Sequence, residues 1–187
     1  MKKRYVKKRL AAAALALATG GAALAGNPTK VSLVIDGNTI RIEVGEGWHP
    51  ALRSRWIAAP DRVPSLERTE AAQMCGDPDE KTLHEMGVLA TKYAKSMMPK
   101  GTPIKADIKG NYRDGRQYAT ITLPDGTIYG EDAIRDGYAC IYRVDNYPAQ
   151  LEQVLQEARD ANRGLWATHP QMMGCLCDQY NHSPAGK

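Results

Sequence analysis

The sequence lacks the motifs that mark several common classes of enzyme. It has no glycine-rich phosphate loop, no G-x-S-x-G nucleophile elbow and no Cys–His nucleophile pattern. Its four histidines show no H-x-x-x-H or similar spacing, which a histidine-ligated metal site would need. These absences argue against P-loop nucleotide hydrolases, α/β-hydrolases and histidine-metal nucleases.

An apolar run long enough for a membrane span is also missing. The run Leu10–Leu24 is shorter than the roughly 20 residues that a spanning helix requires. It follows a cluster of basic residues and ends at the small residues Ala23 and Ala25, a pattern typical of a signal peptide. We expect a cleaved signal peptide at residues 1–25, a periplasmic or secreted protein, and no membrane span after its removal. An uncleaved N-terminal anchor is the alternative.

The chain beyond this segment has no excess of basic residues. Residues 1–25 hold six of the 25 Lys and Arg residues and none of the 21 Asp and Glu residues. The remainder therefore carries 19 basic and 21 acidic side chains, a net charge of about −2. An avid, non-specific nucleic-acid binder usually has a basic surface. Any phosphate contact in this protein should therefore be local.

Cysteine is sparse, but its number suits an exported protein. The four cysteines are Cys75, Cys140, Cys175 and Cys177. In an oxidising compartment they are expected to form disulfides, for which three pairings exist. We favour long-range pairs that connect the C-terminal tail to Cys75 or Cys140, because a Cys175–Cys177 bond would close a very tight ring. A zinc site is the alternative, although this spacing suits it poorly.

Hydrophobic periodicity divides the chain into strands and helices. Strands are expected at 30–35, 40–44, 52–58, 104–108 and 117–123, and helices at 78–98, 131–136 and 148–163. The first two strands should form a hairpin through Asp36-Gly37, with Val31, Leu33 and Ile35 on one face. Asp77 should cap the first helix, with Glu80 three residues later as in a capping box. We expect residues 60–76 to be a long surface loop.

This order of elements predicts an α+β fold. It suits a small five-stranded Greek-key β-barrel with about three packed helices. Residues 26–187 are enough for one domain of ordinary size, which we place at 26–167. Residues 168–187 are expected to be a C-terminal tail, possibly tethered by a disulfide.

Three segments follow one another along the chain: residues 34–40 (VIDGNTI), 53–61 (RSRWIAAPD) and 112–116 (YRDGR). In this order they resemble the staphylococcal nuclease family. The family pattern has Asp-Gly-Asp-Thr, then Arg and Asp-Thr-Pro-Glu, then Tyr-Gly-Arg. The similarity extends from about Val31 to Trp166, and it implies the same OB-type barrel, which is the architecture of that family.

The resemblance implies a calcium site in which two carboxylates are substituted. Asn38 and Ala58 stand where the family has metal-binding aspartates, so the charge that attracts calcium is reduced. Asp36 could act as a replacement ligand, with Asn38 as a weak one, or Asp36 could be a turn residue only. Asp61 stands where the family has a glutamate that orients water, one methylene shorter. It could equally be a solvated loop residue.

The resemblance also implies a phosphate-binding pair of arginines. Arg53 and Arg116 match the family's two arginines, whose planar guanidinium groups suit phosphate oxygens. Arg113 is the alternative to Arg116 if the register slips. Tyr138 and Tyr142 lie where the family presents tyrosines to the nucleotide base, although tyrosines that pack against the barrel would give the same pattern.

Together these features predict an exported, nuclease-like protein with a degenerate metal site. We expect it to be a weak or inactive nuclease that binds a phosphodiester, a nucleic acid or a protein partner through the family's cleft. An active metal-dependent nuclease that cleaves DNA or RNA with Asp36, Asn38 and Asp61 is one alternative. A scaffold or envelope-assembly factor is the other, because a fold does not fix a function.

Overall fold

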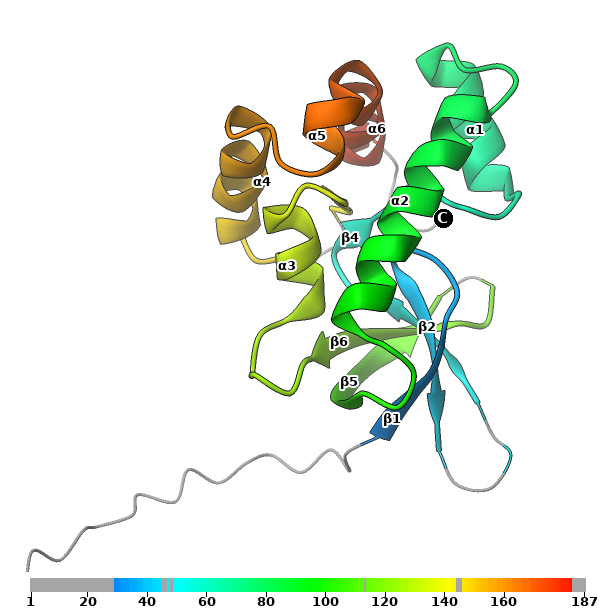
Figure 1. Ribbon diagram of the computed structural model, residues 1–187, viewed down its shortest axis with the longest axis vertical. Coiled ribbons are helices and arrows are strands. Elements are labelled where there is room, and N and C mark those ends of the chain that lie inside the picture. Colours follow the sequence, from blue (N-terminus) through cyan, green and yellow to red (C-terminus); the bar gives the residue numbers. More distant parts are fainter. Residues whose placement is uncertain (1–28, 45–46, 48, 113, 144–145, 183–187) are drawn as a thin grey trace, which may run out of the picture.

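The computed structural model describes residues 29–182 apart from 45–46, 48, 113 and 144–145 (Figure 1). The expected signal peptide lies outside the described residues, and so does Arg113. Figure 1 shows a β-barrel at one end of the molecule, with α2 lying alongside it and most of the other helices gathered at the opposite end. Within the described residues, no helix is long and apolar enough to cross a membrane.

Five strands close into a barrel in the order β1-β2-β3-β6-β5. These strands are β1 (Thr29–Val34), β2 (Thr39–Glu43), β3 (Ala51–Ser54), β5 (Pro103–Asn111) and β6 (Gln117–Thr122). All neighbouring pairs are antiparallel except β3 and β6, which are parallel. The predicted α+β fold with a five-stranded OB-type barrel is confirmed.

The predicted hairpin is present, but one of its side chains points the other way. β1 and β2 pair antiparallel, and Val31, Val34, Ile40 and Ile42 are buried in the barrel. The alternation in the sequence placed Leu33 on this inner face, yet it is 50% exposed. The register shifts between Val31 and Leu33, and such a bulge reverses the inside–outside alternation that follows it.

The third predicted strand, 52–58, is broken into two. β3 ends at Ser54, and the chain turns at Trp56, whose φ is 64°. The short strand β4 (Ile57–Ala58) then leaves the barrel and pairs with β7 (Cys140–Ile141). After this turn the chain leaves the barrel, and Asp61 lies on the lining of a cleft rather than in a barrel strand.

Helix α1 (Leu66–Cys75) lies where a surface loop was expected, so that prediction was wrong. The Ser65 hydroxyl accepts a hydrogen bond from the Arg68 amide and caps its N-terminus. Gly76 ends the helix in the left-handed conformation with φ 74°. The helix was missed because it buries little apolar surface, namely Ala71 and Ala72.

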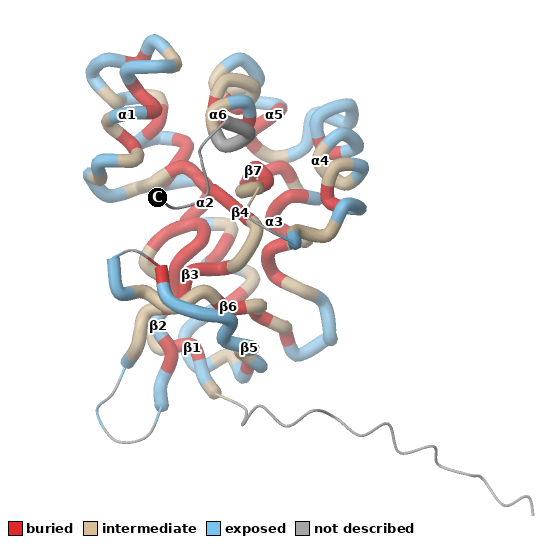
Figure 2. The backbone as a smooth tube through the Cα atoms, turned by 180° about the vertical axis from the view of Figure 1, so that it is seen from behind, coloured by how far each residue is buried: buried red, intermediate tan, exposed pale blue. Residues whose placement is uncertain are grey.

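Helix α2 (Lys81–Met97) is the main helix packed on the barrel. The Asp77 carboxylate accepts hydrogen bonds from the Thr82 and Leu83 amides, as a cap does, but the helix begins at Lys81, later than predicted. Glu80 does not complete the expected capping box and instead binds Arg68 and Thr69 of α1. The inward face of α2 contains Leu83, Met86, Gly87, Ala90, Thr91 and Ala94. Figure 2 shows that buried segments gather where the barrel and the helices meet.

The C-terminal third contains four helices among the described residues. They are α3 (Tyr129–Arg135), α4 (Gln150–Asp160), α5 (Leu165–Thr168) and α6 (Pro170–His182). The expectation of a tail is corrected by α6, whose Met173, Leu176 and Cys177 are buried in a second core with α1 and α5. That burial depends on contacts distant in sequence, which periodicity does not report.

Two disulfides attach α6 to the rest of the molecule. Cys75 at the end of α1 pairs with Cys175, and Cys140 in β7 pairs with Cys177. The preference for long-range pairs is confirmed, and no cysteine remains free for the alternative zinc site. The bridges close loops of 100 and 37 residues and so remove much conformational freedom from the unfolded chain.

Replacing Gly87 tests the contact that positions the loop around Asp61. A Cβ on Gly87 would lie 2.5 Å from backbone atoms of Asp61 and Arg62, so that loop must shift in the Gly87→Ala variant. We expect a loss of about 1–3 kcal/mol in the free energy of unfolding, measured by urea denaturation. Gly174→Ala on α6 is the matched control, since its Cβ meets nothing within 4 Å. Equal stability of the two variants would contradict close packing of α2 against this loop.

Candidate functional site

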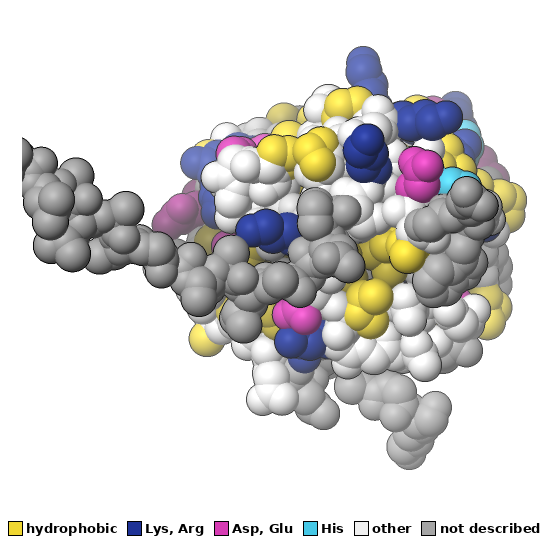
Figure 3. Space-filling model, turned by 90° about the horizontal axis from the view of Figure 1, so that it is seen from below, with side chains coloured by type: hydrophobic (Ala, Val, Ile, Leu, Met, Phe, Trp, Pro, Cys, Tyr) yellow, Lys and Arg dark blue, Asp and Glu magenta, His cyan; other side chains and the backbone are white. Residues whose placement is uncertain are grey.

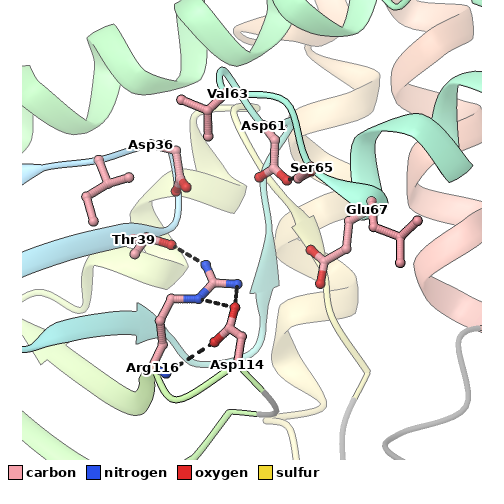
Figure 4. Close-up of a pocket in the computed structure, with 10 residues that line it drawn as sticks. Asp36, Thr39, Asp61, Val63, Ser65, Glu67, Asp114 and Arg116 are labelled. Carbon is pink, nitrogen blue, oxygen red and sulfur yellow. Dashed lines mark hydrogen bonds and ion pairs between the residues drawn. The ribbon is translucent and has the colours of Figure 1, made fainter.

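A cleft of about 540 Å³ lies between the barrel and α1 (Figure 4). Its described lining comes from the β1–β2 turn, the loop before α1, the start of α1 and the loop before β6. The residues are Ile35, Asp36, Thr39, Asp61, Val63, Ser65, Leu66, Glu67, Asp114 and Arg116. Four of these side chains are carboxylates and one is cationic, so the described lining is predominantly acidic.

Asp36 is held in place by the β1–β2 turn. Its side chain is 4% exposed, and its Oδ1 accepts a hydrogen bond from the Asn38 amide at 2.9 Å. The turn is itself fixed from behind, because the buried Tyr129 hydroxyl donates to the Gly37 carbonyl at 2.6 Å. Gly37 also lies against Ala59 and Ala90 so closely that a Cβ would come within 3 Å of both. Asp36 is therefore a turn residue and also part of the lining of the cleft.

Asp61 lies across the cleft from Asp36, and Figure 4 shows both carboxylates pointing into the cavity. The Ser65 hydroxyl donates a hydrogen bond of 2.5 Å to Asp61 Oδ2. Burial raises the pKa of Asp61 from 3.8 to about 6, and the carboxylates of Asp36 and Glu67 act in the same direction. The Ser65 hydrogen bond and Arg53 oppose this rise. Asp61 can therefore hold a proton at mildly acidic pH.

Arg116 reaches the cleft from the loop before β6. Its Nη1 donates to the Thr39 hydroxyl at 2.8 Å, and its Nε donates to Asp114 Oδ2 at 2.8 Å. Burial alone would raise the pKa of Asp114, but the bonds from Arg116 outweigh it and the pKa lies below its ordinary value. The guanidinium group is thus fixed at the edge of the cavity (Figure 4).

Arg53 lies beneath the cleft rather than on its described lining. Its side chain is 2% exposed, and its Nη1 donates to Asn38 Oδ1 at 3.2 Å. Glu67 forms an ion pair with Arg53 at 3.7 Å and also accepts a hydrogen bond of 2.5 Å from the Tyr112 hydroxyl. Glu67 lines the cleft and Arg53 does not, so the carboxylate is the member of this ion pair that faces the cavity.

The ring of Tyr112 brings the two arginines together. The guanidinium carbons of Arg53 and Arg116 lie 4.8 Å and 4.9 Å from its centroid. Such distances are typical of cation–π contacts. Two arginines separated by 63 positions in the sequence thus contact one aromatic side chain.

The other predicted substrate contacts divide between two places. Tyr142 lies near the arginines, with its ring centroid 5.9 Å from the Arg53 guanidinium carbon. Tyr138 stacks on Tyr93 at 4.4 Å and packs against the second core, so the structure does not bring it to the cleft. Arg113 lies outside the described residues.

Sequence reasoning missed four residues at this site. Thr39, Tyr112 and Asp114 lie in the motifs but received no role, and Glu67 lies outside the motifs. The pattern offered a signal for Tyr112 and Asp114, which lie in the same segment as Arg116. It offered none for Glu67, because its position depends on a helix that was not expected.

The positions that the resemblance assigns to calcium do not suit that ion. The Asn38 side-chain oxygen already accepts hydrogen bonds from Thr39 and Arg53, and Ala58 offers only a buried methyl group. Within the described ranges, no group of three or more His, Cys, Asp and Glu side chains is arranged to hold a metal ion. Hard cations require several charged or carbonyl oxygens, so we derive no chemical step through calcium.

The sequence was also compared with those of known protein families. The sequence model described as staphylococcal nuclease homologue matches residues 62–168, more than half of the chain. The chain belongs to the staphylococcal nuclease family. The comparison with curated proteins gives no match. The matched segment of this staphylococcal nuclease homologue includes α1 and Arg116, whereas Asp36 and Arg53 precede it.

The raised pKa of Asp61 makes the stability of this nuclease homologue depend on pH. Because the folded-state pKa lies above the ordinary value, the folded protein retains a proton that the unfolded chain releases between about pH 4 and pH 6. Stability contributed by this group falls as the pH rises through that window. We expect Asp61→Asn to raise the free energy of unfolding by about 1–3 kcal/mol at pH 8 and to leave it unchanged at pH 4.

Urea denaturation at several pH values measures this difference. Glu70→Gln, which removes an exposed carboxylate from α1, is the control and should show no such dependence. A gain for Asp61→Asn that is equal at pH 4 and pH 8 would contradict a raised pKa of Asp61 in the folded protein.

Proposed function

We propose that this member of the staphylococcal nuclease family binds a phosphodiester of single-stranded nucleic acid in the cleft and hydrolyses it weakly or not at all. One observation carries the proposal. The guanidinium groups of Arg53 and Arg116 lie on the same Tyr112 ring, with Arg116 on the lining of the cavity and Arg53 buried next to it. Two convergent guanidinium groups match the geometry of phosphate oxygens.

The phosphate contact would be local rather than spread over the surface. On the face in Figure 3, the Lys and Arg side chains of the described residues are scattered among apolar, polar and acidic ones. The near-neutral charge of residues 26–187 agrees with this distribution. Affinity should therefore come from a few directed contacts, with a weaker dependence on salt than a broad basic surface would give.

Weak hydrolysis follows from the composition of the cleft. The family's metal-binding positions hold Asn38 and Ala58, whose side chains present no carboxylate. Loss of one preorganised charged group at a reaction centre commonly reduces a rate by about 100-fold to 1,000-fold. Asp61 can orient a water molecule, but its proton at mildly acidic pH opposes a role as a base there.

The acidic lining makes binding dependent on pH. Asp36, Asp61, Glu67 and Asp114 repel a phosphodiester, and of these Asp61 is the one whose pKa is raised to about 6. Below that pH the cavity loses one negative charge. Affinity for nucleic acid should therefore increase as the pH falls from 8 to 5.

The export predicted from the sequence forms part of this proposal. Two disulfides are typical of proteins that fold outside the cytoplasm. A signal peptide at residues 1–25 would deliver residues 26–187 to the periplasm or the medium. There the cleft could meet extracellular nucleic acid.

The test combines cleavage and binding by the disulfide-bonded protein. Fluorescein-labelled single-stranded DNA is incubated with the protein in calcium, in manganese and in chelator, and affinity is measured by anisotropy. We expect binding without appreciable cleavage, competition by a mononucleotide, and a loss of about 10-fold to 100-fold in affinity for Arg116→Ala. Arg41→Ala, an exposed arginine on β2 outside the cleft, should bind as the wild type does.

Each other outcome identifies another function. Metal-dependent cleavage that Arg116→Ala abolishes would establish an active nuclease in place of a binding module. Absence of binding, or binding that a mononucleotide does not compete, would overturn the cleft proposal and favour a scaffold. Equal losses for Arg116→Ala and Arg41→Ala would show that the contact is not local.

A further inference from the structure

The side of Arg53 that faces the cleft is occupied by a carboxylate of the protein itself. Glu67 lines the cavity, whereas Arg53 beneath it is 2% exposed. The Glu67 carboxylate pairs with the guanidinium group at 3.7 Å and is fixed by the Tyr112 hydroxyl at 2.5 Å. A carboxylate in this place offers the same kind of oxygen that a phosphate would offer.

We infer that α1 is an autoinhibitory element whose Glu67 occupies the phosphate-binding side of Arg53 until the ligand displaces it. This inference rests on the proposed function of the cleft. A phosphodiester can reach Arg116 in the structure as it stands, but it cannot reach Arg53 unless Glu67 moves. A ligand that binds both arginines therefore requires α1 to shift. It must bind the Arg53 guanidinium more tightly than the Glu67 carboxylate does.

The attachments of α1 are suited to such a shift. Its N-terminal half is held by polar contacts, namely Ser65 to Asp61, and Arg68 and Thr69 to Glu80. Its buried apolar surface is limited to Ala71 and Ala72, and an isolated helix of ten residues is not stable in water. The half of the helix that carries Glu67 is therefore held without a covalent bond.

The opposite end of α1 is held covalently. Cys75, its last residue, is bonded to Cys175 on α6, and α6 is bonded in turn to β7 through Cys177 and Cys140. The disulfide keeps the helix close to the cleft when the polar contacts open. It thereby acts as a hinge that returns Glu67 to Arg53 after the ligand leaves.

Two charge variants on the same helix test this inference. Glu67→Gln removes the competing charge but keeps an oxygen that can accept the Tyr112 hydrogen bond. We expect its affinity for labelled single-stranded DNA to increase about 5-fold to 150-fold, the range typical of coupled equilibria. Glu70→Gln removes an exposed charge three residues further along α1 and should change affinity by less than about twofold. Equal increases in both variants would overturn the inference.

Movement is tested separately from charge. Amide hydrogen exchange of residues 66–75 in the wild type should become faster when the DNA binds, because α1 leaves Arg53. The Cys75→Ser, Cys175→Ser double variant keeps Glu67 but lacks the disulfide that holds α1. We expect its α1 amides to exchange faster than those of the wild type, and we expect it to bind the DNA more tightly than the wild type does. Slower or unchanged exchange of α1 on binding would overturn the inference even if Glu67→Gln bound more tightly.

The failure of this inference is distinguishable from that of the proposed function. Binding that depends on Arg116 but does not respond to Glu67→Gln would leave the proposed function intact and remove the autoinhibitory role of α1. Absence of DNA binding by both the wild type and Glu67→Gln would overturn both.

Discussion

Burial of the Arg53 guanidinium group is the constraint on which the rest of the cleft depends. A charged group taken out of water is unfavourable unless it is paired and hydrogen-bonded. Its described partners come from separate parts of the chain and include Asn38 in the β1–β2 turn, Glu67 on α1 and Tyr112 after β5. The barrel, the turn and the helix must therefore assemble together around one side chain. A phosphate that binds the Arg53 guanidinium would have to replace one of these contacts.

The wall of the cleft that carries Glu67 depends in turn on the C-terminal helix. α1 buries too little apolar surface to dock by itself, and α6 supplies the surface and the disulfide that hold it. A second disulfide fixes α6 to β7, which pairs with β4 just before the loop of Asp61. Residues at the end of the chain thus position carboxylates at the edge of the barrel, although they are distant from them in sequence.

Local patterns predicted the elements whose stability comes from their own amphipathic face. The alternation of apolar residues predicted the β1–β2 hairpin, and three- and four-residue spacing predicted α2 with its stop before Pro99. The same patterns failed at α1 and α6, because those helices are held by disulfides and by a shared second core. They also failed at Leu33, where a bulge in the pairing of β1 exchanges the two faces of the strand.

The sequence by itself determined the fold family and the residues near the cleft. The order of its motifs was sufficient to nominate Asp36, Arg53, Asp61 and Arg116, since a motif keeps its spacing to the turn or strand that carries it. Only the tertiary structure decided that Arg53 pairs with Glu67 and that the Asn38 side-chain oxygen accepts a hydrogen bond from Arg53. It also decided that burial raises the pKa of Asp61 to about 6. The physical reason is that burial and pairing of charges depend on neighbours that are brought together from distant segments.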